Sequence, residues 1–316
     1  MAVLLHKIAD VSATALGGIA APALRFMGKH HNRMTRFQAL QDRAGFQVRT
    51  THYYEPTYAE HDLPADTQKA RFLPGFDMNE GEQLALLRSF HFAEELRAFP
   101  DAKPREDEYG YDNRMYSYGD AEILYNMIRL KKPARIIEIG SGQSTLVARA
   151  AIAANRRDDE GYTCAHICIE PYEMPWLERT GVTVVRERVE DLDLAFFDAL
   201  DANDILFIDS SHVIRPWGDV LREFHQIVPS VTSGVIVHVH DIFTPYDYPE
   251  TWLRQDRRLW NEQYLMESFL CYNSQFKVIC ANHWLKQERF DKFVAACPMT
   301  AEHPDAKPGG FWFQRI

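Results

Sequence analysis

The segment from Arg135 to Thr145 constrains the fold of this chain more than any other. Its first five residues, Arg135-Ile-Ile-Glu-Ile, are mostly apolar and β-branched, which is typical of a parallel strand covered on both faces. Gly140 and Gly142 follow, and the next ten residues strongly favour a helix. A glycine turn between a strand and a helix lets a ligand approach backbone amide donors closely. The segment therefore predicts an α/β sheet with a nucleoside-bearing cofactor at this turn.

The glycine pattern distinguishes between two kinds of cofactor site. A nicotinamide-type Rossmann turn has three glycines in the order G-x-G-x-x-G and an acidic residue about 20 positions later. Here Thr145 occupies the third glycine position, and Glu138 lies just ahead of the glycines. This E-x-G-x-G arrangement resembles motif I of the class I S-adenosylmethionine-dependent methyltransferases. The resemblance implies cofactor contacts at Glu138, near the methionine amino group, and at Gly140, Ser141, Gly142 and Ser144.

Short apolar segments alternate with helical ones after this motif, which predicts further strands at 164–170, 182–185, 204–209 and 234–240. Two later strands, 276–281 and 310–315, fit the sixth and seventh strands of the methyltransferase sheet, the last of them antiparallel. Helices are expected around 250–271 and 285–296. The predicted fold is a Rossmann-like, mostly parallel methyltransferase sheet, and the resemblance covers about residues 109–316.

Acidic residues end or follow the predicted strands, and such residues converge on one rim of an open α/β sheet. The resemblance assigns Glu170 to the ribose hydroxyls, Glu190 to the loop beside the adenine, and Asp209 to the cofactor side of the fourth strand. The runs F-I-D-S-S-H and H-D-I-F-x-P-Y-D-Y-P are similar to the bacterial group often called methyltransferase family 24. Many members of that group are presumed O-methyltransferases of sugars, surface glycans or secondary metabolites.

Methyl transfer to a hydroxyl group requires a base, and three residues at the predicted strand tips suit this chemistry. His240 and Asp241 follow the fifth strand, and His212 lies three residues beyond Asp209. Histidine titrates near neutral pH and can accept the proton. We rank His240 slightly ahead of His212, and we expect His238 to be a hydrogen-bonded core histidine.

The same tips also predict a divalent-metal site made of Asp209, His240 and Asp241, with His212 as a further candidate. In metal-dependent relatives an acidic pair follows the fifth strand, and His240 here replaces its first member. Magnesium prefers oxygen ligands, whereas imidazole suits zinc or iron. A metal-dependent hydroxylase on the same scaffold is therefore a second function, and a noncatalytic glycan-binding protein is a third.

Charge and cysteine content restrict the partners. The chain has 316 residues and a net charge of -10, which disfavours a nucleic-acid substrate and leaves a small molecule or glycan. Its five cysteines lie mostly in apolar stretches and predict reduced thiols, without a disulfide framework. Nothing in the composition predicts an oligomeric state.

Residues 1–108 are expected to form an N-terminal helical extension and linker ahead of a methyltransferase domain at 109–316. A helix is predicted from Glu80 to Phe99, with Asn79 and Glu82 as its N-terminal cap. The apolar stretch at 3–24 is interrupted by charges and Pro22, so we favour a packed or membrane-surface amphipathic helix over a signal peptide. The expected location is cytoplasmic, with peripheral membrane contact through this segment.

Two aromatic stretches are candidates for the substrate pocket. The run from Tyr109 to Asp120 predicts either a lid or pocket wall, or ordinary packing at the sheet edge, with equal weight. Tyr246 and Tyr248 would suit stacking on a sugar ring or on an aromatic substrate.

Overall fold

The computed structural model describes residues 2–30, 33–52, 54–172 and 174–316. It divides the chain into two compact units, Met1–Asp66 and Thr67–Ile316. This division differs from the predicted boundary at residue 108, because residues 67–108 pack with the sheet. In helix α3 (Glu80–Arg88), the Gln83 side chain accepts a 2.7 Å hydrogen bond from the backbone amide of Ala281 in strand β6 (Phe276–Ala281).

The second unit contains one seven-stranded sheet with the order β3-β2-β1-β4-β5-β7-β6. All neighbouring pairs from β3 to β5 are parallel, and β7 is antiparallel to both β5 and β6. The strands are β1 (Arg135–Ile139), β2 (Ala165–Ile169), β3 (Thr183–Val185), β4 (Ile205–Ile208), β5 (Ile236–Val239), β6 (Phe276–Ala281) and β7 (Phe311–Arg315). The predicted Rossmann-like methyltransferase sheet is confirmed.

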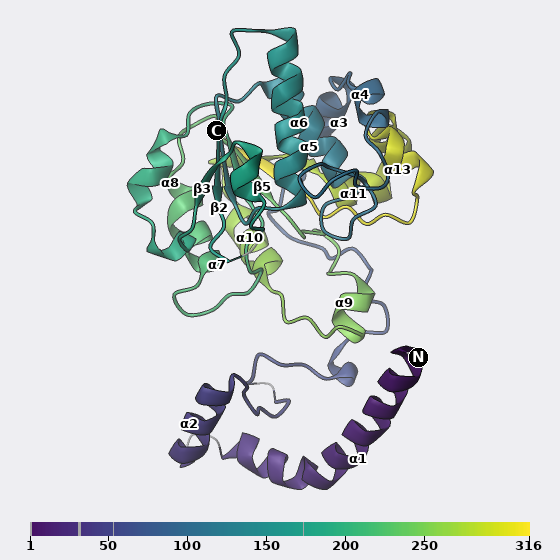
Figure 1. Ribbon diagram of the computed structural model, residues 1–316, viewed down its shortest axis with the longest axis vertical. Helices are drawn as coiled ribbons and strands as arrows, with labels where there is room; N and C mark the ends of the chain where they lie inside the picture. The colour runs from purple at the N-terminus through teal and green to yellow at the C-terminus, as the bar shows by residue number, and fades with distance from the viewer. Residues whose placement is uncertain (1, 31–32, 53, 173) are drawn as a thin grey trace. The chain divides into compact units, whose positions relative to one another are not determined.

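Helices cover both faces of this sheet, as Figure 1 shows. Helices α5 (Asp120–Lys131) and α6 (Gln143–Asp158) pack on one face. The other face carries α7 (Asp219–Arg222), a π-helical turn (Glu223–Ile227), α8 (Val228–Ser230) and α10 (Glu262–Leu270). Alternation along β1 places Ile136 on the α5 and α6 side and Ile137 and Ile139 on the opposite side.

Three predicted helices are broken into shorter ones. The segment 80–99 forms α3 and α4 (Ala93–Arg97), because the Ser89 hydroxyl donates to the Leu86 carbonyl and ends the first helix. Asn79 does not cap this helix, since its side chain donates instead to the Val278 carbonyl. The segments 250–271 and 285–296 become α9 (Glu250–Arg254) with α10, and α11 (Asn282–Glu288) with α12 (Phe290–Ala296). A short α13 (Pro298–Glu302) precedes β7.

The first unit contains α1 (Ala2–Lys29), α2 (Thr35–Ala44) and a 3-10 turn, η2 (Glu60–Asp62). Among the helices of the described residues, none is both long and apolar enough to cross a membrane. The five cysteines are free thiols, and four of them are buried, as predicted.

Candidate active site

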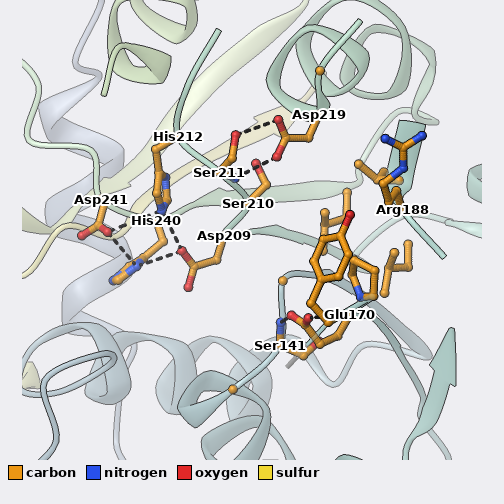
Figure 2. Close-up of a pocket in the computed structure, with 18 of the residues that line it drawn as sticks. Ser141, Glu170, Arg188, Asp209, Ser210, Ser211, His212, Asp219, His240 and Asp241 are labelled. Carbon is orange, nitrogen blue, oxygen red and sulfur yellow. Dashed lines mark hydrogen bonds and ion pairs between the residues drawn. The ribbon is translucent and has the colours of Figure 1, made fainter. Parts of the chain in front are cut away.

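One cavity of about 880 Å³ lies over the carboxyl ends of the parallel strands. Its walls come from the loops after β1, β2, β4 and β5, together with the 3-10 turn η4 (Val189–Asp191). The chain order reverses between β1 and β4, and ligands of open α/β sheets bind at such a switch point. The cavity volume is within the range of small-molecule sites. Figure 2 shows Ser141, Glu170 and Arg188 in one part of it, and Asp209, His212, His240 and Asp241 in another.

The glycine loop forms the first part of the cavity. Gly140 has φ +75°, and a Cβ atom there would lie 1.8 Å from the Asp209 carbonyl oxygen, so only glycine fits. The Ser141 amide donates to Glu170 Oε2 at 3.3 Å, and the buried Ser141 hydroxyl has no hydrogen-bond partner among the described residues. Gly142, Ser144 and Glu190 also line the cavity. Of the predicted cofactor residues, this part thus gathers Gly140, Ser141, Gly142, Ser144, Glu170 and Glu190.

Glu138 does not lie on the cavity wall, which differs from its predicted position. It shares a strand face with Ile136, so its side chain points toward α6 and is 2% exposed. Its carboxylate accepts hydrogen bonds from the hydroxyls of Ser144 at 2.5 Å and Thr145 at 2.7 Å. His166 Nε2 lies 3.0 Å away and Cys168 Sγ 3.4 Å away. The hydrogen bonds of Glu138 therefore stabilise the first turn of α6.

The second part of the cavity holds a cluster of Asp209, His212, His240 and Asp241, which we call the acidic-histidine cluster. Asp209 Oδ1 lies 3.3 Å from His212 Nε2 and 3.4 Å from His240 Nδ1. Asp241 Oδ2 lies 3.6 Å and 3.7 Å from the same two nitrogens. His212 and Asp241 both have positive φ angles, +60° and +57°, which are uncommon for residues other than glycine. The four predicted chemical residues are thus brought together.

Two buried carboxylates outside the predicted set hold the imidazoles of this cluster. Glu262 Oε2 in α10 lies 2.9 Å from His212 Nδ1. Asp120 Oδ2, at the start of α5, lies 3.4 Å from His240 Nε2 and accepts a 2.9 Å hydrogen bond from the Gly309 amide. The contact with His212 spans 50 residues and that with His240 spans 120, so no local sequence pattern could reveal them.

The charges of the cluster shift its proton affinities. Burial would lower the pKa of His240, but Asp241, Asp209 and Asp120 together raise it well above its ordinary value. The pKa of His212 is likewise raised against burial, mainly by Asp209 and Glu262. Burial would raise the pKa of Asp209, but His240 and His212 lower it instead. Asp209 is therefore an ionised acceptor between two imidazoles.

The donor set of the cluster fits a divalent metal ion. Asp209, His240 and Asp241 each offer one ligand atom, and these atoms all lie within 4.8 Å of one another. Two carboxylates and one imidazole match the mixed oxygen and nitrogen ligands of zinc and iron sites.

Comparison with known proteins agrees with this architecture. Residues 137–242 match the family model described as "Methyltransferase domain". The match indicates a methyltransferase domain over these residues. An uncharacterized protein of Archaeoglobus fulgidus is 30% identical over 138 residues, a match that covers 42% of this chain and 61% of that protein.

Two solved structures show a distant likeness. The O-methyltransferase from Bacillus cereus, in complex with SAH, is 12% identical with a TM-score of 0.36, covering 75% of this chain and 91% of that chain. A mutant of the 16S rRNA (adenine(1408)-N(1))-methyltransferase from Catenulisporales acidiphilia is 11% identical with a TM-score of 0.25, covering 50% and 81%.

Three tryptophan side chains form part of the cavity wall. Trp217, Trp252 and Trp260 all line the wall, and the Trp260 ring lies 4.3 Å from that of His212. The Arg258 guanidinium lies 4.1 Å from the Trp252 ring and 4.4 Å from the Trp260 ring. This wall was not predicted, because Trp217 and Trp260 lie in irregular segments and Trp252 lies in the short helix α9, so no single periodic pattern joins the three residues.

The predicted aromatic stretches contribute little to this wall. Tyr246 and Tyr248 are absent from the cavity lining, and the Tyr248 side chain is buried. In the run from Tyr109 to Asp120, only Arg114, Met115 and Tyr116 reach the cavity. Its remaining tyrosines mostly pack against Phe99 or one another, so packing dominates.

His238 is a core residue, as expected, but it is not hydrogen-bonded. Its ring lies 4.2 Å from Phe207 and 4.3 Å from Trp312, and neither ring nitrogen has a partner among the described residues. Burial lowers the pKa of His238 well below its ordinary value, so the ring is neutral. Its side chain therefore packs as an aromatic residue.

Proposed function

We propose that this chain transfers a methyl group from S-adenosylmethionine to a hydroxyl oxygen of a sugar, glycan or hydroxylated small metabolite. The observation that carries the proposal is the cavity that joins the glycine loop to the acidic-histidine cluster. A methyl donor held by the loop and an acceptor held at the cluster would therefore share one cavity. Bringing two reactants together in this way supplies much of the rate enhancement of a transfer reaction.

The loop after β1 and the acids after β2 and β3 would hold the cofactor, which supplies an electrophilic methyl group when bound. The unpartnered hydroxyl of Ser141 offers a polar contact on this wall. Glu170 is oriented by the amides of Ser141 and Tyr172, at 3.3 Å and 2.9 Å. A carboxylate held in this way suits the vicinal hydroxyls of a ribose.

His212 is the proton acceptor that the geometry favours, ahead of His240. In the transfer step the acceptor oxygen bonds to the methyl carbon, the carbon–sulfur bond breaks with its electrons left on sulfur, and the hydroxyl proton passes to neutral His212, the form present above the raised pKa of this histidine. The Glu262 carboxylate, 2.9 Å from Nδ1, orients the His212 ring so that Nε2 faces the cluster. A carboxylate that fixes the far nitrogen of a histidine base is a recurrent catalytic arrangement.

His240 is better suited to hold a metal ion together with Asp209 and Asp241. When bound, a divalent ion would lower the pKa of the acceptor hydroxyl. Asp120, at 3.4 Å from His240 Nε2, would fix the orientation of this imidazole through the ring nitrogen that does not face Asp209.

The tryptophan wall supports a carbohydrate as acceptor. Trp217 is 94% exposed, and it lines the cavity together with Trp252 and Trp260. Flat aromatic faces with a polar edge suit sugar rings, which present both C–H groups and hydroxyls. Arg258, between Trp252 and Trp260, adds a positive charge beside this wall.

The test is an activity screen of the full chain with S-adenosylmethionine and a panel of monosaccharides, nucleotide sugars, glycans and phenols. Release of S-adenosylhomocysteine is measured before and after chelation and after adding back Mg²⁺, Mn²⁺, Zn²⁺ or Fe²⁺. We expect turnover with at least one carbohydrate and its loss in the variant His212→Asn. Turnover with phenols alone would contradict the carbohydrate assignment.

The hydroxylase alternative draws on one observation, the presence of two imidazoles and two carboxylates within a single cluster. Such donors also suit iron enzymes that activate oxygen. The family match favours methyl transfer. Oxygen consumption with Fe²⁺, in the absence of any S-adenosylhomocysteine release, would reverse this preference.

A further inference from the structure

Helix α1 carries an exposed apolar face. Val11, Ile19 and Phe26 are 69%, 81% and 59% exposed. With Ala15 and Pro22 between them, these residues follow one another at intervals of three or four positions, so they share one side of the helix. A contiguous apolar stripe on a helix surface marks a place where another apolar phase is bound.

The charges of the same helix lie beside the apolar stripe and at the end of the helix. Helical geometry places Lys7 and Arg25 along one edge of the stripe and Asp10 on the opposite side, and Lys29 is in the last turn. Residues 1–49 contain seven lysines and arginines but only two acidic residues, in a chain whose net charge is -10. The N-terminal segment is therefore a basic, amphipathic element attached to an acidic protein.

The helix has the length, but not the composition, of a membrane span. Its 28 residues would extend about 42 Å, more than the apolar thickness of a bilayer. Within the described part of the chain, however, no helix meets the apolarity needed to cross a membrane. A long helix with one apolar face and a basic polar face lies in the plane of the interface.

We propose that α1 binds the surface of an anionic lipid bilayer, with Val11, Ile19 and Phe26 in the acyl boundary and Lys7, Arg25 and Lys29 at the phosphate headgroups. The positive charge of the N-terminal segment favours an anionic bilayer over a second copy of the chain as the partner of α1. Two paired copies of α1 would bring like charges together, whereas an anionic surface neutralises them. The proposal does not depend on the methyl-transfer reaction.

The test is flotation of the full chain with vesicles of phosphatidylcholine alone and of phosphatidylcholine mixed with phosphatidylglycerol. We expect binding to the mixed vesicles, weaker binding at high salt, and little binding to the neutral ones. The variant Ile19→Asp places a charge on the apolar stripe and should weaken binding at least about tenfold. Thr14→Asp adds the same charge on the polar side and should weaken binding far less.

Folding and self-association are checked on the same samples. Equal affinity of all variants for S-adenosylmethionine would show that the second unit stays folded, and light scattering would report the oligomeric state. Failure of the wild-type chain to float, or equal flotation of Ile19→Asp and wild type, would overturn the proposal. A dimer that Ile19→Asp dissociates, without vesicle binding, would instead assign the apolar face to a second copy.

Discussion

Among the described residues, the clusters around Glu138 and Asp209 both combine carboxylate and histidine side chains, and they differ in what surrounds them. The Glu138 carboxylate accepts hydrogen bonds from the hydroxyls of Ser144 and Thr145 and contacts the ring of His166, and its side chain is 2% exposed. Around Asp209, two imidazoles lie at 3.3 Å and 3.4 Å and the side chain is 28% exposed toward the cavity.

Residue type alone therefore does not identify a chemical site. A buried carboxylate with all its hydrogen bonds satisfied within the chain stabilises local structure. A carboxylate that shares its neighbours with other acids and opens on a cavity retains the capacity to bind a ligand or an ion. On this basis the Glu138 cluster braces the cofactor loop, and the acidic-histidine cluster carries the chemistry.

The largest effect is expected from Asp209→Asn, which removes the charge nearest both imidazoles. Turnover should fall by about 10²- to 10⁴-fold, and divalent-ion affinity should fall with it, while the melting temperature changes little. Steady-state kinetics on an acceptor found in the screen, with calorimetric ion titration, measures both. Unchanged turnover in this variant would remove the acidic-histidine cluster from the reaction.

Gly140→Ala should disrupt the connection between the two parts of the cavity. The new Cβ would meet the Asp209 carbonyl oxygen at 1.8 Å in a backbone with φ +75°. We expect a loss of about 3 kcal/mol or more in the free energy of unfolding, and at least tenfold weaker cofactor binding. The matched control is Gly142→Ala, whose Cβ would meet only Met174 Cε, at 3.7 Å. Equal stability of the two variants would contradict the geometry of the loop.

His283 lies outside both clusters, and its protonation should lower the stability of the fold at acid pH. Burial lowers the pKa of His283 to about 4, with a further contribution from Lys286. Between the folded pKa and the unfolded pKa of about 6.5, His283 binds a proton in the unfolded chain but not in the folded chain. The free energy of unfolding should therefore fall by about 3 kcal/mol between pH 6.5 and 4.

Denaturant titrations at several pH values measure this loss. The variant His283→Leu should lack it, whereas the exposed control His225→Gln should retain it. An unchanged pH profile in His283→Leu would assign the acid sensitivity to other groups.

Glu138→Gln is the isosteric counterpart of Asp209→Asn and should have the smallest effect. An amide cannot accept hydrogen bonds at both terminal atoms, so one of the contacts to Ser144 and Thr145 is lost. We expect a loss of about 1 to 3 kcal/mol in the free energy of unfolding, with ion affinity unchanged. A drop in ion affinity comparable to that of Asp209→Asn would make the two clusters equivalent and refute the distinction between them.

The sheet and much of the site could be predicted from the sequence because their signals are local. The strand and glycine pattern at 135–145 predicted the cofactor loop, and the rule that parallel strands end at one rim brought Asp209, His212 and His240 together. Glu138 was misplaced, since the rule ignores which face of the strand a residue occupies.

The remaining features depend on packing between distant segments. Glu262 and Asp120 are far from their histidine partners in the chain, and only the folded sheet brings each pair into contact. The tryptophan wall likewise draws on separate segments: Trp217 lies in a turn before α7, Trp252 in the short helix α9, and Trp260 in an irregular stretch before α10. No periodic pattern links these segments, so their packing could not be predicted from the sequence.

The most direct test of the cofactor site is a calorimetric titration of the full chain with S-adenosylmethionine, before and after chelation of divalent ions. We expect saturable binding at one site per chain that survives chelation, because the loop around Ser141 and Glu170 is separate from the acidic-histidine cluster. Absence of binding under both conditions would contradict the assignment of this cavity to the cofactor.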